Sequence, residues 1–168
     1  MPPWTSLRRL APAEAPLYRA LRLEGLADTP EAFGTTLAIE SARRPEAFVH
    51  RLEQTAVFAA CNGDHLLGMA GYARETGPKM QHKGVLWGMY VKPQARGTGA
   101  APALVQAVLA HARTEVEQVL LTVIAGNTAA RRLYKNQGFI EYGLEPRALQ
   151  QDGTYYDEVL MLNFLNNK

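Results

Sequence analysis

The sequence has only one cysteine, Cys61, among its 168 residues. An intramolecular disulfide is therefore excluded, and a reducing compartment, the cytoplasm, is the expected location. Cys61 ends the apolar run 55–61, so we interpret it as a packed core residue rather than a nucleophile. The 4 histidines lack the spacing of metal ligands, and we expect no metal cofactor.

A long hydrophobic segment is also absent. The longest nearly apolar stretch, 100–112, is too short to span a bilayer and contains Gln106. The first twenty residues contain Glu14 and lack an apolar core before a small-residue cleavage site, so we expect no signal peptide. Charge is nearly balanced, because 18 basic and 16 acidic residues give a net charge of +2. We therefore expect neither a nucleic-acid nor a membrane partner.

The residues that remain are typical of a globular protein, and the length predicts one domain over residues 1–168. Periodicity, prolines and glycines predict strands near 6–10, 55–61, 65–74, 84–91, 118–124, 139–145 and 155–164, and helices near 13–26, 30–40, 45–54, 100–113 and 128–137. In condensed form the order is β-α-α-β-β-β-α-β-α-β-β. This order predicts an α/β protein with a mixed sheet.

A glycine-rich loop, 91–101, lies between a predicted strand and a predicted helix. Backbone N–H groups at such a helix start can face an anion, and Gly97 and Gly99 permit close approach. Arg96 adds a positive charge. The loop is therefore a candidate pyrophosphate site, although it could also be a plain tight turn. Pro102 breaks the dinucleotide fingerprint, and no Gly-Lys-Ser/Thr triplet occurs, which weakens a nucleotide-binding scaffold as an alternative.

A second segment, 127–139, makes the pattern more specific. Residues 94–99 (Gln-Ala-Arg-Gly-Thr-Gly) resemble the coenzyme A signature of the GNAT superfamily of acetyl-CoA-dependent N-acetyltransferases. The second signature of that family is matched by Asn127, Ala130, Leu133, Tyr134, Gly138 and Phe139. The resemblance implies a GNAT-like acyl-CoA N-acyltransferase fold, acetyl-CoA as co-substrate, and direct attack by the amine without a covalent enzyme intermediate.

The resemblance also implies roles for individual residues. The coenzyme would be held by Met89, Tyr90, Val91, Gln94, Ala95, Arg96, Gly97, Thr98, Gly99, Ala100, Ala101, Asn127, Ala130 and Tyr134. A backbone N–H at Val91 or Tyr90 would polarise the thioester carbonyl, and Tyr134 would be the general acid. From the residues alone, Tyr134 could instead be a packed core tyrosine, and Asn127 could be only a helix N-cap.

The sequence departs from the family pattern at the general base. Many relatives carry a glutamate on the strand before the glycine loop, but 84–91 holds no carboxylate. The candidates that remain are Glu24, Glu75, His82 and Glu158, or a water molecule. No spacing chooses among them.

The acceptor is likewise open. By the resemblance, the segments 22–36 and 149–156 wall the acceptor site. Asp28, Glu31 and Asp157 could bind a cationic amine, Arg22 could bind a carboxylate, and Phe33 and Trp87 could line a pocket, although burial in the core is the favoured interpretation of both aromatic side chains.

The predicted function is transfer of an acetyl group from acetyl-CoA to a primary amine, namely a small metabolite, a peptide N-terminus or a lysine. The alternative is a regulatory module that binds acyl-CoA without turnover. Because the last predicted strand, 155–164, is rich in apolar residues, we also expect a homodimer that pairs along an exposed strand edge.

Overall fold

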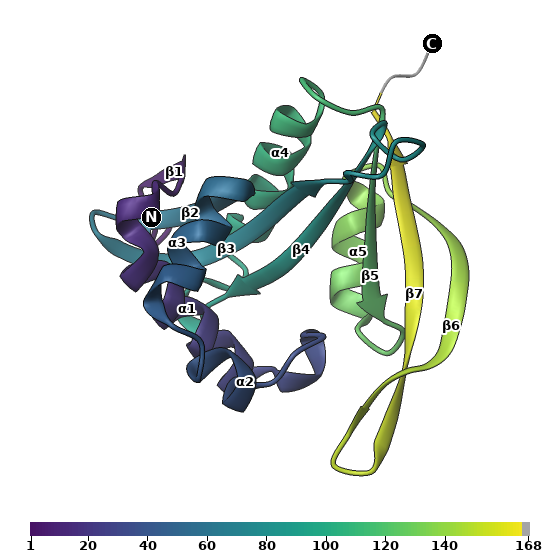
Figure 1. Cartoon of the computed structure of the whole chain (residues 1–168), viewed down its shortest axis with the longest axis horizontal. Coiled ribbons are helices and arrows are strands. Elements are labelled where there is room, and N and C mark those ends of the chain that lie inside the picture. Colours follow the sequence, from purple (N-terminus) through teal and green to yellow (C-terminus); the bar gives the residue numbers. More distant parts are fainter. Residues whose placement is uncertain (166–168) are drawn as a thin grey trace.

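A computed structural model describes residues 1–165. Its strands are β1 (Ser6–Arg9), β2 (Ala56–Asn62), β3 (His65–Arg74), β4 (Lys83–Val91), β5 (Gln118–Ile124), β6 (Ile140–Gln151) and β7 (Thr154–Phe164), and its α-helices are α1 (Ala15–Asp28), α2 (Leu37–Ser41), α3 (Pro45–Gln54), α4 (Ala100–Ala112) and α5 (Thr128–Asn136). The strands form one sheet in the order β1-β2-β3-β4-β5-β7-β6, in which only β4 and β5 are parallel (Figure 1). The predicted α/β class with a mixed sheet is confirmed.

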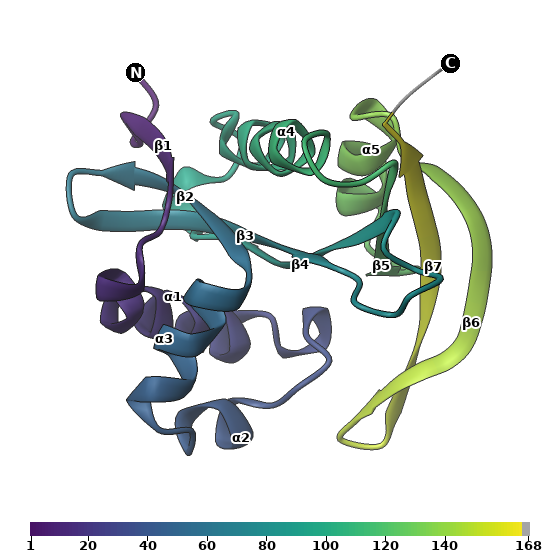
Figure 2. The ribbon, with the colours of Figure 1, turned by 45° about the horizontal axis from the view of Figure 1, so that its top comes forward.

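Helices cover both faces of the sheet. Figure 2 shows α1, α2 and α3 on one face and α4 and α5 on the other. The first layer buries Tyr18, Leu21, Phe48 and Leu52 against the sheet, and the second buries residues such as Leu104, Val105, Val108 and Phe139. Since each helix presents one apolar side to a sheet face, burial of these side chains fixes the layers.

Helix α4, which follows the glycine loop, and helix α5, which follows β5, begin where the sequence predicts. Gly99, with φ of 86°, precedes α4, and the side chain of Asn127 caps α5 by accepting the Ala130 N–H at 3.1 Å. Gly138, with φ of 94°, follows the end of α5, where a left-handed residue is common. These ends are set by local chemistry, which explains why the sequence predicts them.

Two predicted elements are corrected. Residues 30–40 are not one helix, because a short 3-10 turn, Pro30–Ala32, is followed by extended backbone at Phe33, whose side chain is buried. The helix resumes only as α2, which Thr36 caps. Strand β6 also continues past 145 to Gln151, through a bulge near Arg147, because Pro146 is tolerated on an edge strand.

The central strands β4 and β5 diverge along their length. Their parallel ladder covers only Lys83–Val85 on β4 and Gln118–Leu120 on β5, whereas the β5–β7 ladder runs along all of β5. Figure 1 shows the two strands separating toward the C-terminal end of β4. The divergence opens the middle of the sheet at the point where the glycine loop begins.

The position of β7 differs from the expectation about assembly. β7 pairs with β5 on one side and β6 on the other, so its edges are used within the chain. The free edges of the sheet are β1 and β6, and on β6 the side chains of Ile140, Tyr142 and Leu144 are exposed. Separately, none of the helices within residues 1–165 is both long and apolar enough to cross a membrane.

Glu40, on the short helix α2, is a buried carboxylate that collects three arginines. Its Oε1 lies 3.4 Å from Arg22 NH2, 3.3 Å from Arg51 NH2 and 3.6 Å from Arg43 Nε. Burial acts to raise the pKa of Glu40, but Arg22 and Arg51 outweigh it and hold that pKa below its usual value. The cluster ties α2 to α1 and α3.

We predict that Glu40→Ala lowers the free energy of unfolding by about 3 kcal/mol at neutral pH, because it leaves the buried Arg22 without its carboxylate. Arg43→Ala, which removes a largely exposed partner, should cost less than about 1 kcal/mol. Since the folded-state pKa of Glu40 is lowered, its contribution falls as pH drops through that pKa. Urea unfolding at neutral and acidic pH should therefore show the Glu40→Ala deficit shrinking in acid. Equal losses in both variants would contradict this account.

Candidate functional site

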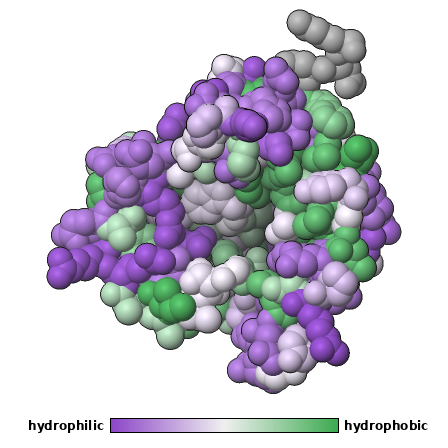
Figure 3. All heavy atoms as spheres, turned by 45° about the vertical axis from the view of Figure 1, so that its right-hand side comes forward, coloured by the Kyte–Doolittle hydropathy of each residue, from purple (hydrophilic) through white to green (hydrophobic). Residues whose placement is uncertain are grey.

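The opening between β4 and β5 holds two adjoining cavities of about 520 and about 880 Å³. They share Ala32, Met89, Ile124 and Asn127, so they form parts of one cleft. Figure 3 looks onto a face that is hollowed near its centre, with both hydrophobic and hydrophilic side chains around the hollow. We call the smaller cavity the inner cavity and the larger one the outer cavity.

The glycine loop is shaped as an anion-binding turn. Gly97 and Gly99 have φ of 73° and 86°, and a Cβ built on either would meet no atom within 4 Å. Within residues 1–165, the N–H groups of 97–99 donate to no other backbone group, and the first turn of α4 leaves its own leading N–H groups free. The loop therefore presents free donors beside open space, which is the chemistry that a pyrophosphate requires.

Side chains of the loop hold it in place. Thr98 accepts a hydrogen bond from Trp4 Nε1 at 3.1 Å and donates to the Ala95 carbonyl at 2.5 Å. Ala95 and Ala100 are buried. These contacts fix the loop against the N-terminal segment and the sheet, so its backbone geometry exists before any ligand binds.

Arg96 links the loop to α1. Its NH2 donates to Asp28 Oδ2 at 2.6 Å, and its Nε donates to the Val91 carbonyl at 3.0 Å. Hydrogen bonds from Arg96 and then Tyr90 lower the pKa of Asp28. Asp28 is therefore engaged by these two residues and lines neither cavity, which corrects the expectation that it binds a substrate amine.

The end of β4 directs a backbone N–H away from β3. Lys92 N–H donates to the Leu67 carbonyl at 2.8 Å, and Val91 pairs with Gly68 in the ladder register. Successive residues of an antiparallel ladder point their N–H and C=O groups to opposite sides. The N–H of Val91 therefore faces the opening between the strands, as its carbonyl does when it accepts from Arg96. Val91 lines the outer cavity.

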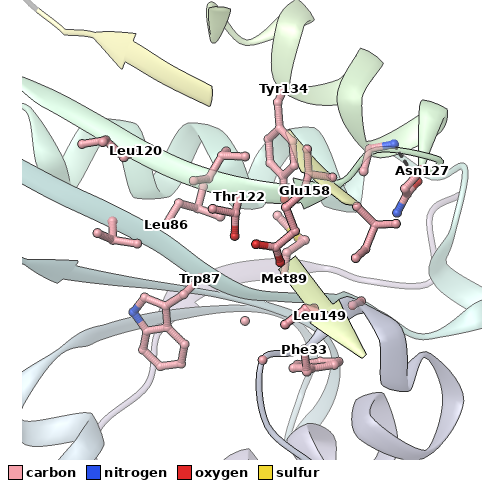
Figure 4. Close-up of a pocket in the computed structure, with 18 of the residues that line it drawn as sticks. Phe33, Leu86, Trp87, Met89, Leu120, Thr122, Asn127, Tyr134, Leu149 and Glu158 are labelled. Carbon is pink, nitrogen blue, oxygen red and sulfur yellow. Dashed lines mark hydrogen bonds between the residues drawn. The ribbon is translucent and has the colours of Figure 1, made fainter. Parts of the chain in front are cut away.

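Tyr134 projects from α5 into the inner cavity (Figure 4). Its ring packs edge-on against Phe139 with centroids 5.7 Å apart, and the side chain is 5% exposed. Burial raises the pKa of its phenol above the usual value, so the proton is held at neutral pH. Burial is the one cause of this shift, and the hydroxyl makes no hydrogen bond to another residue within 1–165.

Of the four named base candidates, only Glu158 lines either of these two cavities. It lies on β7 opposite Ile124 of β5, and Figure 4 shows its carboxylate between Thr122 and Met89. Burial raises its pKa most, the negative charge of Glu145 adds to this, and the Thr122 hydroxyl acts in the opposite direction. Glu24 instead pairs with Lys92 at 3.1 Å.

The other predicted site residues fall into three groups. Tyr90, Arg96 and Met89 line the outer cavity, Ala130 and Met89 the inner one, and Asn127 both while also capping α5. The remaining predicted residues of the glycine loop and of the turn before it line neither cavity: Gln94, Ala95, Gly97, Thr98, Gly99, Ala100 and Ala101. For the acceptor, Arg22, Phe33, Trp87 and Leu149 line the inner cavity, and Glu31, Tyr156 and Asp157 line the outer one.

Sequence reasoning missed the contribution of β5. Leu120, Thr122 and Ile124 line the inner cavity, because alternate residues of this strand point into the cleft. The run 118–124 reads as a uniformly buried strand, yet Thr122 is a polar position within it and is exposed. That single polar residue is the signal that one side of β5 faces an opening.

Comparison with known families agrees with this geometry. The model of the acetyltransferase (GNAT) family matches residues 19–139. The chain belongs to this family. The family is one of acetyltransferases. Within residues 1–165, no three His, Cys, Asp or Glu side chains are grouped so that they could hold a metal ion.

Individual relatives are more distant. The chain is 31% identical over 153 residues to a mycothiol acetyltransferase of Thermobispora bispora, covering 86% of this chain and 50% of that protein. The chain thus spans about half the length of the curated mycothiol acetyltransferases that it matches. It is 29% identical over 159 residues to an L-methionine sulfoximine/L-methionine sulfone acetyltransferase of Pseudomonas aeruginosa, covering 84% and 92% of the two chains.

Solved structures share the fold. A ribosomal-protein-alanine N-acetyltransferase from Brucella melitensis matches with a TM-score of 0.82 at 24% identity, over 95% of this chain and 99% of that one. A putative acetyltransferase from Salmonella typhimurium, solved with its cofactor acetyl-CoA, matches with a TM-score of 0.84 at 16% identity, over 97% and 95%. At these identities the likeness concerns the fold alone.

Proposed function

We propose that the chain is an N-acetyltransferase that uses acetyl-CoA to acetylate a primary amine. One observation carries the proposal: the unpartnered hydroxyl of Tyr134 and the carboxylate of Glu158 line the same cavity. An acid that holds its proton and a base that can accept one are the two groups that aminolysis of a thioester needs. Glu158 would supply the carboxylate that β4 lacks, which favours turnover over the alternative of a sensor.

The glycine loop and the diverging strands fit the coenzyme. Free backbone donors at 97–101 suit its pyrophosphate, with open space where Cβ atoms would stand at Gly97 and Gly99. The unpaired part of β4 and the small Ala130 leave room for the pantetheine arm along the outer and inner cavities. The putative acetyltransferase of the same fold was solved with acetyl-CoA, in agreement with this proposal.

The bound thioester supplies an acetyl group that is already activated for transfer. The chain contributes three groups. Val91 donates its N–H to the carbonyl oxygen, where negative charge develops. Glu158 accepts a proton from the substrate ammonium, and Tyr134 gives its proton to the sulfur.

Atoms balance as follows. The nitrogen forms a bond to the carbonyl carbon and the carbon–sulfur bond breaks. Of the two protons that the ammonium loses, one replaces the phenolic proton that Tyr134 gave to sulfur. The other leaves Glu158 for solvent.

Several finer points stay part of the proposal. The acceptor is a small molecule or a peptide amine, consistent with relatives named for mycothiol and for methionine sulfoximine. We further propose that residues 1–168 form one N-acetyltransferase domain acting in the cytoplasm. A homodimer would pair through the free edge of β6 rather than through β7, because β7 is already paired on both sides.

We predict that Gly97→Ala weakens acetyl-CoA binding at least tenfold, because the added methyl group occupies the space next to the proposed pyrophosphate. Gly63→Ala is the matched control, since Gly63 also has a left-handed φ, 58°, and open space around its Cβ, but lies in the β2–β3 turn. Both changes carry a similar backbone strain of about 1 kcal/mol. Calorimetric titration that shows the same affinity in both variants would remove the loop from the coenzyme site.

We predict that Tyr134→Phe lowers kcat by about 100-fold, because the proton donor is lost. The KM for acetyl-CoA should hardly change, since the phenyl ring keeps its packing. Tyr72→Phe is the control: Tyr72 is also buried and its hydroxyl also lacks a partner, but it lines neither cavity. Steady-state thiol release from both variants, together with melting curves, separates catalysis from packing. An unchanged kcat in Tyr134→Phe, with chemistry rate-limiting, would exclude it as the acid.

We predict that Glu158→Gln lowers kcat/KM by about 100-fold or more and abolishes the acidic limb of the pH profile. Glu145→Gln should keep the plateau rate but move that limb to lower pH, because the negative charge of Glu145 raises the pKa of Glu158. The pH dependence of kcat/KM for the wild type and both variants measures this. A limb that stays in place in Glu158→Gln would assign the base elsewhere.

A further inference from the structure

Arg22 is a buried cation with unused hydrogen-bonding capacity. It projects from α1, is 7% exposed and lines the inner cavity. Its only hydrogen bond within residues 1–165 runs from NH2 to Glu40 Oε1 at 3.4 Å, and its buried Nε and NH1 have no partner. A guanidinium carries five N–H donors. Leaving most of them unpaired in the interior is costly unless a ligand completes them.

The surrounding charges point to an anionic ligand. Arg22, Arg43 and Arg51 all converge on the single carboxylate of Glu40. Because three guanidinium groups surround one carboxylate, this cluster has an excess of positive charge. Of the three arginines only Arg22 lines the cavity, so it is the one through which this excess can be balanced by a bound molecule.

Packing holds the Arg22 guanidinium in a fixed orientation. Its Cζ lies 5.4 Å from the centroid of the Phe33 ring and 5.7 Å from that of Trp87. Gly88, which also lines the cavity, has a φ of 63°, and a Cβ at this position would lie 3.3 Å from Arg22 NH1. The glycine thus keeps the space next to NH1 open. A planar cation held between aromatic rings is suited to a carboxylate.

The same cavity also contains the carboxylate of Glu158. Arg22 comes from α1 and Glu158 from β7, so one positive and one negative group line the cavity from different sides of the cleft. Much of the remaining lining is apolar, with Phe33, Leu86, Trp87, Met89 and Leu149 (Figure 4). This arrangement is complementary to a molecule that has an ammonium, a carboxylate and an apolar remainder.

We propose that the acceptor is a free amino acid with an apolar side chain, whose carboxylate binds Arg22 while its amine faces Glu158. The inference rests on the proposed acetyltransferase function and names its substrate class. It disfavours protein lysines and simple alkylamines, which bring no carboxylate to Arg22 and leave its donors unpaired. Arg22 is a binding residue and takes no part in proton transfer.

The test compares acceptors that differ only at the carboxylate. L-Methionine, L-leucine and L-phenylalanine are assayed beside their carboxamides and their decarboxylated amines, with saturating acetyl-CoA and the wild-type chain. We expect kcat/KM for each acid to exceed that for its amide by about 100-fold, the usual scale for loss of one partner of a buried charge pair.

Arg22→Met then removes the charge while keeping an apolar side chain between the rings, and Glu40 retains Arg43 and Arg51. We expect KM for the acids to rise about 100-fold, so that the preference for acids over amides is lost. Arg51→Met is the matched control, because Arg51 also contacts Glu40 but lines neither cavity. It should keep the preference for acids. Melting curves report the folding of both variants.

A second measurement does not depend on turnover. Binding of N-acetyl-L-methionine, which has the carboxylate but no ammonium, is titrated calorimetrically and should be lost in Arg22→Met but not in Arg51→Met. No preference for acids in the wild type, or a preference that survives Arg22→Met, would overturn the inference. Turnover of amides and amines alone would leave the acetyltransferase proposal standing, whereas absence of acetyl-CoA binding would overturn that proposal instead.

Discussion

The divergence of β4 and β5 is the constraint on which the rest of the site depends. Parallel pairing stops after Val85 and Leu120, so backbone groups that would otherwise bond across the sheet face an opening. An open seam in a sheet is normally unfavourable, because unpaired backbone groups lose hydrogen bonds. Here β7 pairs with the whole of β5 on its other side, and β3 pairs with β4. Each half of the sheet is therefore held together by its own ladder, and the backbone groups that face the seam stay available.

Each group that we propose to act in the site reaches the seam from a different part of the chain. Val91 comes from β4, Tyr134 from α5, Glu158 from β7 and Arg22 from α1. Their environments differ accordingly: burial without a hydrogen-bond partner keeps Tyr134 protonated, while burial and the neighbouring Glu145 make Glu158 a stronger proton acceptor than an ordinary glutamate. The pKa of Tyr134 is raised far above neutrality, whereas the pKa of Glu158 is raised from the acidic range. A proton donor and a proton acceptor can therefore be present at the same pH.

The buried cation on α1 shows how stability and binding are linked. Glu40 holds the Arg22 side chain against α2, but three arginines share the one negative charge of Glu40. The Nε and NH1 donors of Arg22 therefore stay unpaired within residues 1–165. Aromatic rings of Phe33 and Trp87 fix the guanidinium without using those donors. A binding group held ready in this way loses little conformational entropy when a ligand arrives. The same ion pairs that tie α2 to α1 and α3 thus also hold Arg22 at the inner cavity.

The sequence by itself determined the features that depend on neighbouring residues: the glycine loop, the Asn127 cap, the end of α5 at Gly138 and most strands and helices. These follow from backbone conformation and side-chain periodicity over a few residues, and the two signatures around them identify the family. Only the tertiary structure decided which candidate carboxylate lines the cavity of Tyr134, that Asp28 is engaged by Arg96, that β7 is interior while β1 and β6 are the edges, and that Phe33 breaks the helix expected over 30–40. Each of these results from pairing between segments far apart in the chain. Such pairing is set by the burial of whole faces and by ladder register, which no local pattern specifies.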